Sequence, residues 1–194
     1  IVNGNVIINV NATLMDRDKL FDEVEAAGEG LYGGDVLDHD AQRYTIKTRR
    51  SGVILDEQGM DVLGSALCLF GGGKGRETEI WGSTTVNLNK GFVFQVFGGS
   101  EEGIIGKAVT TGGTYTFKGK SFKQDDKYSC TINLRSPNDA NAEAEFIYGG
   151  GFLGPVCGNT ILNLGKGRVF NTFAGACNAD ILGHTETYMG RQKL

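Results

Sequence analysis

The chain repeats one stretch of about 20 residues, and this internal repeat restricts the possible folds more than any other feature. Residues 80–99 align with residues 156–175 without a gap, and residues 2–11 match residues 80–89 once a glycine is moved by one place. Within the copies, apolar and polar residues alternate, which is typical of a strand with one buried face. An antiparallel sandwich would repeat turn signals every 8 to 12 residues or so without repeating so long a stretch.

A second motif, an aromatic residue followed by small residues, accompanies the repeat. It begins at Tyr32, Phe70, Phe97, Tyr148 and, in degenerate form, Phe173. An Ile/Val-x-Gly turn follows the last four, beginning at Ile80, Ile104, Val156 and Ile181. Paired glycines allow the sharp corner that a β-arch needs. The spacing between the aromatic residues suits one coil of two or three short strands, so the sequence predicts an all-β, parallel β-solenoid or β-arch stack.

We expect residues 1–194 to form a single domain. The repeat blocks cover about residues 69–107 and 146–190, and a less regular segment, about 110–145, separates them. That segment holds strand-like runs at 114–117 and 128–134, which fit a divergent coil with a hairpin insertion. One short helix is predicted over about 16–27, with Asp16 as its N-cap and Gly28 as its stop, and it would serve as a cap or insertion in the stack.

Asparagine occupies one equivalent position in three copies of the repeat, at Asn9, Asn87 and Asn163. If the copies stack in register about 4.8 Å apart, these amides can hydrogen-bond along the stack as a ladder. The alternative is that each asparagine is simply a solvated or turn-forming residue.

Four widely spaced cysteines are candidates for disulfide bonds: Cys68, Cys130, Cys157 and Cys177. Three intramolecular pairings are possible, and four buried thiols are the alternative. The sequon Asn11-Ala12-Thr13 makes Asn11 a glycosylation candidate, and the chain begins with Ile1 instead of Met. Both features favour an extracellular or cell-surface location, where disulfides persist.

Several function classes lose their usual sequence signals. The formal net charge is −4 with no run of like charges, which argues against nucleic-acid binding, and no apolar stretch is long enough for a membrane span. The acidic group Asp35, Asp38 and Asp40 around His39 does not match a calcium loop and fits a polar loop better. Residues 71–75 lack the ending of a phosphate-binding loop.

The fragments that a polygalacturonase-like site would need are present but incomplete. They are Asp125-Asp126, Gly183-His184-Thr185 and Arg191-Gln192-Lys193, and the last two are crowded into nine residues. We therefore expect no catalytic residue, no cofactor and no metal.

The phrases Phe-Gly-Gly, Ile-x-Gly-x-Thr-x-Val-Asn-Leu and Gly-x-Val-Phe resemble the glycine-punctuated repeats of extracellular β-solenoid proteins. Bacterial surface adhesin and autotransporter-type stalks are examples, and the style is similar to that of β-arch proteins in methanogen cell sheaths. The resemblance implies an exported protein that forms a polymer or a surface, and it brings no catalytic residues.

We therefore expect a non-enzymatic structural protein that self-assembles into a sheath, surface layer or filament, with the copy at 181–188 as a candidate contact between molecules. One alternative is an adhesin stalk or binding module for glycan or host protein, with Trp81 and Phe152 as contact residues. The other is a β-helix polysaccharide lyase or hydrolase.

Overall fold

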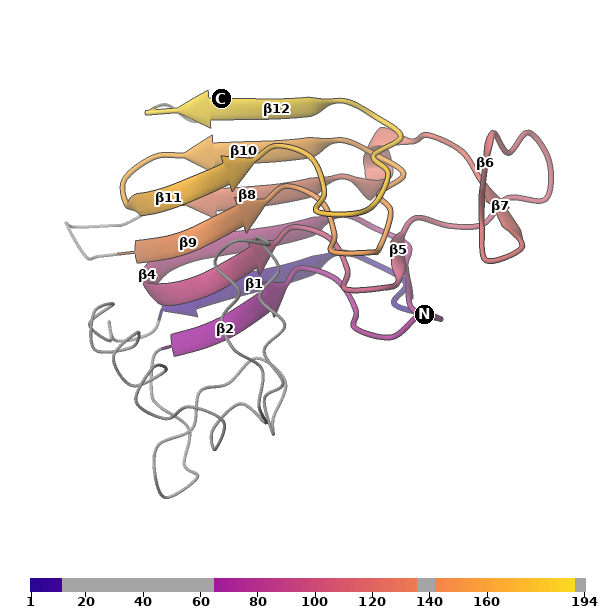
Figure 1. Ribbon diagram of the computed structural model, residues 1–194. Helices are drawn as coiled ribbons and strands as arrows, with labels where there is room; N and C mark the ends of the chain where they lie inside the picture. Colours follow the sequence, from indigo (N-terminus) through magenta and orange to yellow (C-terminus); the bar gives the residue numbers. More distant parts are fainter. Residues whose placement is uncertain (12–64, 136–141, 191–194) are drawn as a thin grey trace, which may run out of the picture.

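The computed structural model describes residues 1–11, 65–135 and 142–190, which form an all-β structure with mostly parallel strands (Figure 1). The all-β prediction is confirmed, and the helix expected at 16–27 lies outside the described residues. A single turn of 3-10 helix, η1 (Asp126–Tyr128), is present. The strands are β1 (Val6–Asn11), β2 (Ser65–Phe70), β3 (Glu79–Ile80), β4 (Thr84–Phe97), β5 (Ile104–Ile105), β6 (Tyr115–Phe117), β7 (Lys120–Phe122), β8 (Cys130–Leu134), β9 (Ala142–Tyr148), β10 (Thr160–Leu164), β11 (Arg168–Phe173) and β12 (Thr185–Met189).

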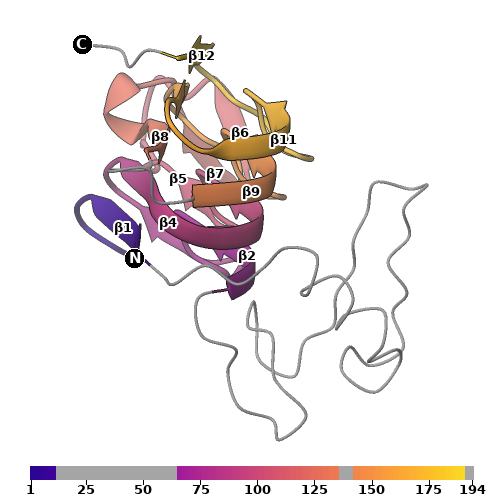
Figure 2. The ribbon, with the colours of Figure 1, turned by 90° about the vertical axis from the view of Figure 1, so that its left-hand side faces the viewer.

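Most strands stand in two parallel rows that share β4. The first row is β1, residues 84–88 of β4, β8, β10 and β12, and the second row is β2, residues 91–97 of β4, β9 and β11. A third row consists of short contacts, the β3–β5 pair and single bridges, that join Val2, Ile80, Ile105, Val156 and Ile181. Figures 1 and 2 show the strands of the first two rows lying one above the other.

A glycine marks the corner between the first and second rows. Gly91 in β4 has a φ of 106°, and Gly167 between β10 and β11 has a φ of 144°. Both values lie in the left-handed region, where a side chain would strain the backbone. This explains why a glycine follows a lysine at the same point of both long repeats.

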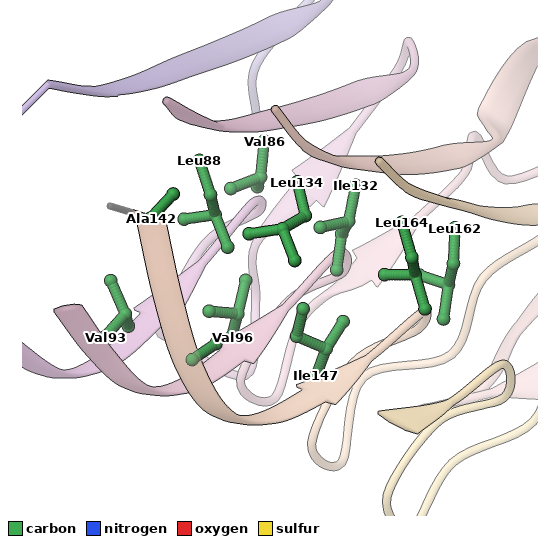
Figure 3. Close-up of a cluster of buried hydrophobic side chains, with 11 residues drawn as sticks. Val86, Leu88, Val93, Val96, Ile132, Leu134, Ala142, Ile147, Leu162 and Leu164 are labelled. Atoms are coloured by element: carbon green, nitrogen blue, oxygen red, sulfur yellow. The ribbon is translucent and has the colours of Figure 1, made fainter. Parts of the chain in front are cut away.

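The hydrophobic core lies between the first two rows (Figure 3). The inward positions named by the sequence alternation, Val86, Leu88, Leu162 and Leu164, are all buried there, and Val10 packs against the same cluster. Facing them from the second row are Val93, Val96, Ala144 and Ile147. Strand alternation in the first row therefore produces the core directly.

The two most similar repeats are not neighbours in space. β8 lies between β4 and β10, and β9 lies between β4 and β11. These intervening strands come from residues 130–134 and 142–148, at the end of the divergent segment and just beyond it. The expected strand runs at 114–117 and 128–134 correspond to β6 and β8, and β6 pairs with β7 as an antiparallel hairpin outside the rows.

One turn position needs correction. The sequence motif makes Ile104 equivalent to Ile80 and Val156, but the structure pairs Ile105 with both of them, and Ile104 pairs with Glu79. The chain leaves the rows directly after this corner to form the β6–β7 hairpin. Gly106 therefore does not have to lead into the next strand of the first row. At this corner, the residue equivalent to Ile80 and Val156 lies one position later than the motif predicts.

Candidate functional site

A row of asparagine side chains runs along the outer side of the first row of strands. Asn87 Nδ2 donates to Asn9 Oδ1 at 2.8 Å, Asn133 Nδ2 donates to Asn87 Oδ1 at 2.7 Å, and Asn163 Nδ2 donates to Asn133 Oδ1 at 2.7 Å. The structure thus brings together the three asparagines named from the sequence and adds a fourth, Asn133. The sequence signal for the fourth was available, because Thr-Ile-Asn-Leu at 131–134 differs from Thr-Val-Asn-Leu at 85–88 only by Ile in place of Val.

The glycosylation candidate sits at the end of the same face. Asn11 is exposed, and its Oδ1 accepts a hydrogen bond from Asn89 Nδ2 at 2.9 Å. N-glycosylation modifies the amide nitrogen, so this bond and a glycan are compatible.

Aromatic rings form a second ladder at the end of the second row. Phe70, Phe97, Tyr148 and Phe173 stack with centroid separations of 4.8, 4.9 and 4.9 Å and interplanar angles of 12° or less. The separation matches the spacing of hydrogen-bonded strands, so in-register pairing alone sets the stacking distance. These are the aromatic positions of the second sequence motif, except Tyr32, which lies outside the described residues.

The glycines after these rings are required by close approach of the backbone. A Cβ on Gly71, Gly98 or Gly149 would lie within 3.0 Å of the carbonyl oxygen of the next corner, a separation that real Cβ atoms essentially never show. The fourth corner carries Ala174 instead, and no described corner stacks on its far side. The degenerate form of the motif therefore coincides with the end of the second row.

Threonine hydroxyls tie these corners to the first row of strands. Thr84 Oγ1 donates to the Gly98 carbonyl at 2.5 Å, and Thr160 Oγ1 donates to the Ala174 carbonyl at 2.5 Å. Both threonines are fully buried, so each hydroxyl needs the partner that it has. The same bond recurs in both long repeats.

The structure contains none of the intramolecular pairings that the four candidate cysteines allow. No disulfide joins Cys68, Cys130, Cys157 and Cys177; Cys130 and Cys157 are buried, and Cys177 is exposed. Burial raises the pKa of Cys68, Cys130 and Cys157 to about 12. The rows place these three residues in packed positions, where a thiol behaves as a small apolar group.

The β6–β7 hairpin is held to the third row through Glu79. Lys120 Nζ contacts Glu79 Oε1 at 2.5 Å, and Trp81 Nε1 donates to Glu79 Oε2 at 2.8 Å. Burial raises the pKa of Glu79, but the bonds from Lys120 and Trp81 and the charge of Lys120 outweigh it, so the net pKa is below its ordinary value of 4.5. Lys107 Nζ lies 4.3 Å from the centre of the Trp81 ring.

The two ends of the stack expose strand edges and apolar side chains. β12 and β11 end their rows on one side, and β1 and β2 end them on the other, so within the described residues each of these strands is paired along one edge. The first row extends one strand beyond the second, and Met189 on β12 is 78% exposed as a result. Large hydrophobic side chains exposed near the ends are Ile7, Phe170 and Phe173.

The residues weighed as fragments of an enzyme site have structural partners. Asp125 caps η1 by accepting from the Lys127 backbone N–H, Asp126 accepts from Gln124, and His184 Nε2 lies 2.6 Å from Glu186 Oε1. Residues 35–40 and 191–193 lie outside the described part of the chain. Among described residues, no cluster of three potential metal-ligating side chains occurs.

No helix in the described ranges is long and apolar enough to cross a membrane. Comparisons with protein-family models, with curated proteins and with solved structures found no match.

Proposed function

We propose that this protein is a non-enzymatic structural protein outside the cell, a β-solenoid that self-assembles into a surface polymer such as a sheath, layer or filament. The observation that carries the proposal is the first row, in which five strands stack in one register and, within the described residues, the two outermost strands are paired along one edge. Open edges of parallel sheet template the addition of further strands.

The path of the chain supports the solenoid interpretation. From Ile80 the chain passes through the third, first and second rows in turn, and it does so again from Ile105 and from Val156. Each circuit adds one strand to each row, as in a solenoid of three-sided coils. Of these three circuits, the longest is the one from Ile105, which also carries the β6–β7 hairpin.

A mechanical role fits the way in which polar and aromatic side chains are used. The amides of the asparagine ladder bond to one another, and the rings of the aromatic ladder stack on one another. Both arrangements strengthen a cross-β stack along its axis, as in durable fibrils. Such a stack gains from continuation into another copy of the chain.

The test is electron microscopy of the purified protein at neutral pH over a range of concentrations, with fibre diffraction of the assemblies. We expect ordered filaments, tubes or sheets with a reflection near 4.7–4.8 Å along the stacking axis. A Cys177→Ser variant, imaged with and without reductant, separates stacking from cross-linking, because Cys177 is the exposed cysteine. Monodisperse particles at every concentration would contradict the proposal.

A binding module is the second candidate, because Phe152 and Leu153 expose 38% and 37% of their surface at one corner. Of the two aromatic contacts expected from the sequence, Phe152 is the better placed, since the Trp81 ring is half-buried beneath Lys107. A glycan array with the parent chain and a Phe152→Ala variant tests this role. Binding that the variant loses would favour the module, and no binding by the parent chain would remove it.

A further inference from the structure

Resting on that proposed function, we propose that copies join head to tail, with β1 of one copy adding to the open edge of β12 of the copy before it. The partner is thus a second copy of this chain, and the joint continues the register of the first row. The argument comes from the direction of backbone hydrogen bonds, from the side-chain columns and from the corner at Ala174.

The hydrogen bonds of the first row repeat in one phase. The first N–H of each strand donates to the carbonyl just before the next strand: Val6 to Ser83, Thr84 to Ser129, Cys130 to Asn159 and Thr160 to His184. At the far end of the strands, Arg135 donates to Leu88, Gly165 to Leu134 and Gly190 to Leu164. In a parallel pair, alternate residues bond to the same neighbour.

The same alternation determines which backbone N–H and C=O groups are available on the outer edges of β12 and β1. On β12, the backbone groups of Thr185, Thr187 and Met189 point away from β10, and on β1 those of Ile7 and Asn9 point away from β4. These two sets are complementary. In the joint, Thr185 N–H donates to the Asn5 carbonyl of the next copy, as Thr160 does to His184 within the chain.

The side-chain columns also continue across the joint. Following the register through the first row places Glu186 opposite Ile7, Thr187 opposite Ile8 and Tyr188 opposite Asn9 of the next copy. Asn9 uses its Oδ1 to accept from Asn87, so its Nδ2 is directed towards the joint. In the third row, the same step brings Ile181 to Val2.

The corner at Ala174 favours this joint over an alternative in which β11 would pair directly with β2 of the next copy. In that arrangement the Ala174 Cβ would meet a glycine corner at a separation that is forbidden at Gly71, Gly98 and Gly149. The head-to-tail joint avoids the clash, because β12 extends one strand beyond β11 and therefore holds β11 and the next β2 one strand apart. Thr187, polar in a column otherwise built from Ile8, Val86, Ile132 and Leu162, faces that space.

Cysteine cross-linking between two variants tests the register. One variant carries Ile7→Cys and the other Glu186→Cys, each with Cys177→Ser to remove the exposed native thiol. Diamide, a thiol oxidant, is added to the mixture, and the products are separated on a non-reducing gel. Opposite residues of paired strands lie close enough for a disulfide, so we expect a dimer band from the mixture.

The matched control replaces Ile7→Cys with Asn11→Cys, on the same face of β1 but four residues away, a displacement of about 13 Å. We expect at least ten-fold less dimer from that mixture, and from either variant alone. Parent-like circular dichroism shows that each variant is folded. Equal cross-linking in both mixtures, or none where microscopy shows polymers, would overturn the joint and leave the proposed function standing. Absence of polymers would instead overturn the proposed function.

Discussion

Gly98 shows how strictly single positions are specified in this stack. A methyl group there would collide with the Gly149 carbonyl, and the neighbouring backbone can move little because the Gly98 carbonyl accepts from Thr84 and the Gly149 N–H donates to the Phe173 carbonyl. We expect Gly98→Ala to lower the free energy of unfolding by about 3 kcal/mol, at the upper end of overpacking effects. Urea denaturation measures this difference.

The matched control is Ala174→Gly at the equivalent corner. Because no described backbone stacks beyond Ala174, loss of its methyl group relieves no clash, and a change below about 1 kcal/mol is expected. A Gly98→Ala variant as stable as the parent chain would show that the corners do not fit as closely as described.

The asparagine ladder distinguishes inner from outer members. Asn133 is 4% exposed and makes two amide bonds, one with Asn87 and one with Asn163, whereas Asn9 makes one and is exposed. We expect Asn133→Ala to cost about 2 kcal/mol and Asn9→Ala less than about 1 kcal/mol, because buried groups that lose a partner are penalised most. Thermal or urea unfolding of both variants checks the ranking, and equal losses would argue against a ladder whose strength comes from burial.

Thiol chemistry provides another residue-level check. Cys68, Cys130 and Cys157 have a pKa raised to about 12 by burial, so they hold little thiolate near pH 8, and Cys177 is exposed. We expect one fast-reacting thiol per native chain with an aromatic disulfide reagent, and loss of that phase in Cys177→Ser. Four thiols of equal rate would contradict the described packing.

At the scale of elements, the β6–β7 hairpin depends on an acid-sensitive anchor. The pKa of Glu79 is lowered, so its bond to Lys120 contributes stability above the ordinary value of 4.5 and loses that contribution as the pH falls through the folded-state pKa. We expect the parent chain to lose more stability than Glu79→Gln between about pH 6 and pH 3. Lys120→Met should flatten the profile similarly. Parallel profiles for all three proteins would remove Glu79 from this role.

The strands could be predicted inside the two repeat blocks, and less well in the segment between them. Alternation at Val86, Leu88, Leu162 and Leu164 identifies core positions, because period-two patterning is a local property of a half-buried strand. The register error at Ile104 has a different origin: that corner leads into a hairpin, and the order of side chains does not show where the chain departs. Asn133 is missed because its strand lies in the segment predicted to be divergent, although three of its residues are identical to the repeat and Ile132 replaces a valine.

For the asparagine ladder too, the sequence predicts the positions but not the contacts between them. Equivalent positions in a repeat predict a row of amides, but their hydrogen bonds depend on stacking between residues up to 78 positions apart. Spacing along the chain does not show which thiols the rows place side by side, so the sequence leaves three cysteine pairings and free thiols as alternatives. Cysteine pairing is set by tertiary structure.

Across the whole molecule, stability should fall from the middle of the stack towards its ends. Among the strands that the structure describes, inner ones such as β4 and β8 are paired on both edges, and β1 and β12 are paired on one. Native-state hydrogen exchange should therefore be slowest in β4 and β8 and fastest in β1 and β12. In the proposed polymer, β1 and β12 should gain protection. Uniform exchange in the isolated chain would contradict the predicted gradient. Polymers in which β1 and β12 stay unprotected would contradict the predicted gain in protection.

The β6–β7 hairpin is a site at which a foreign peptide could be inserted. The first row accommodates a departure of the chain between Ile105 and Cys130 without losing register, so this corner tolerates added length. A foreign peptide inserted at the tight turn of Lys118 and Gly119, both of which are exposed, would be displayed on the surface of the hairpin. With five strands per chain in the first row, the proposed polymer would carry one such peptide roughly every 24 Å, a regular molecular display.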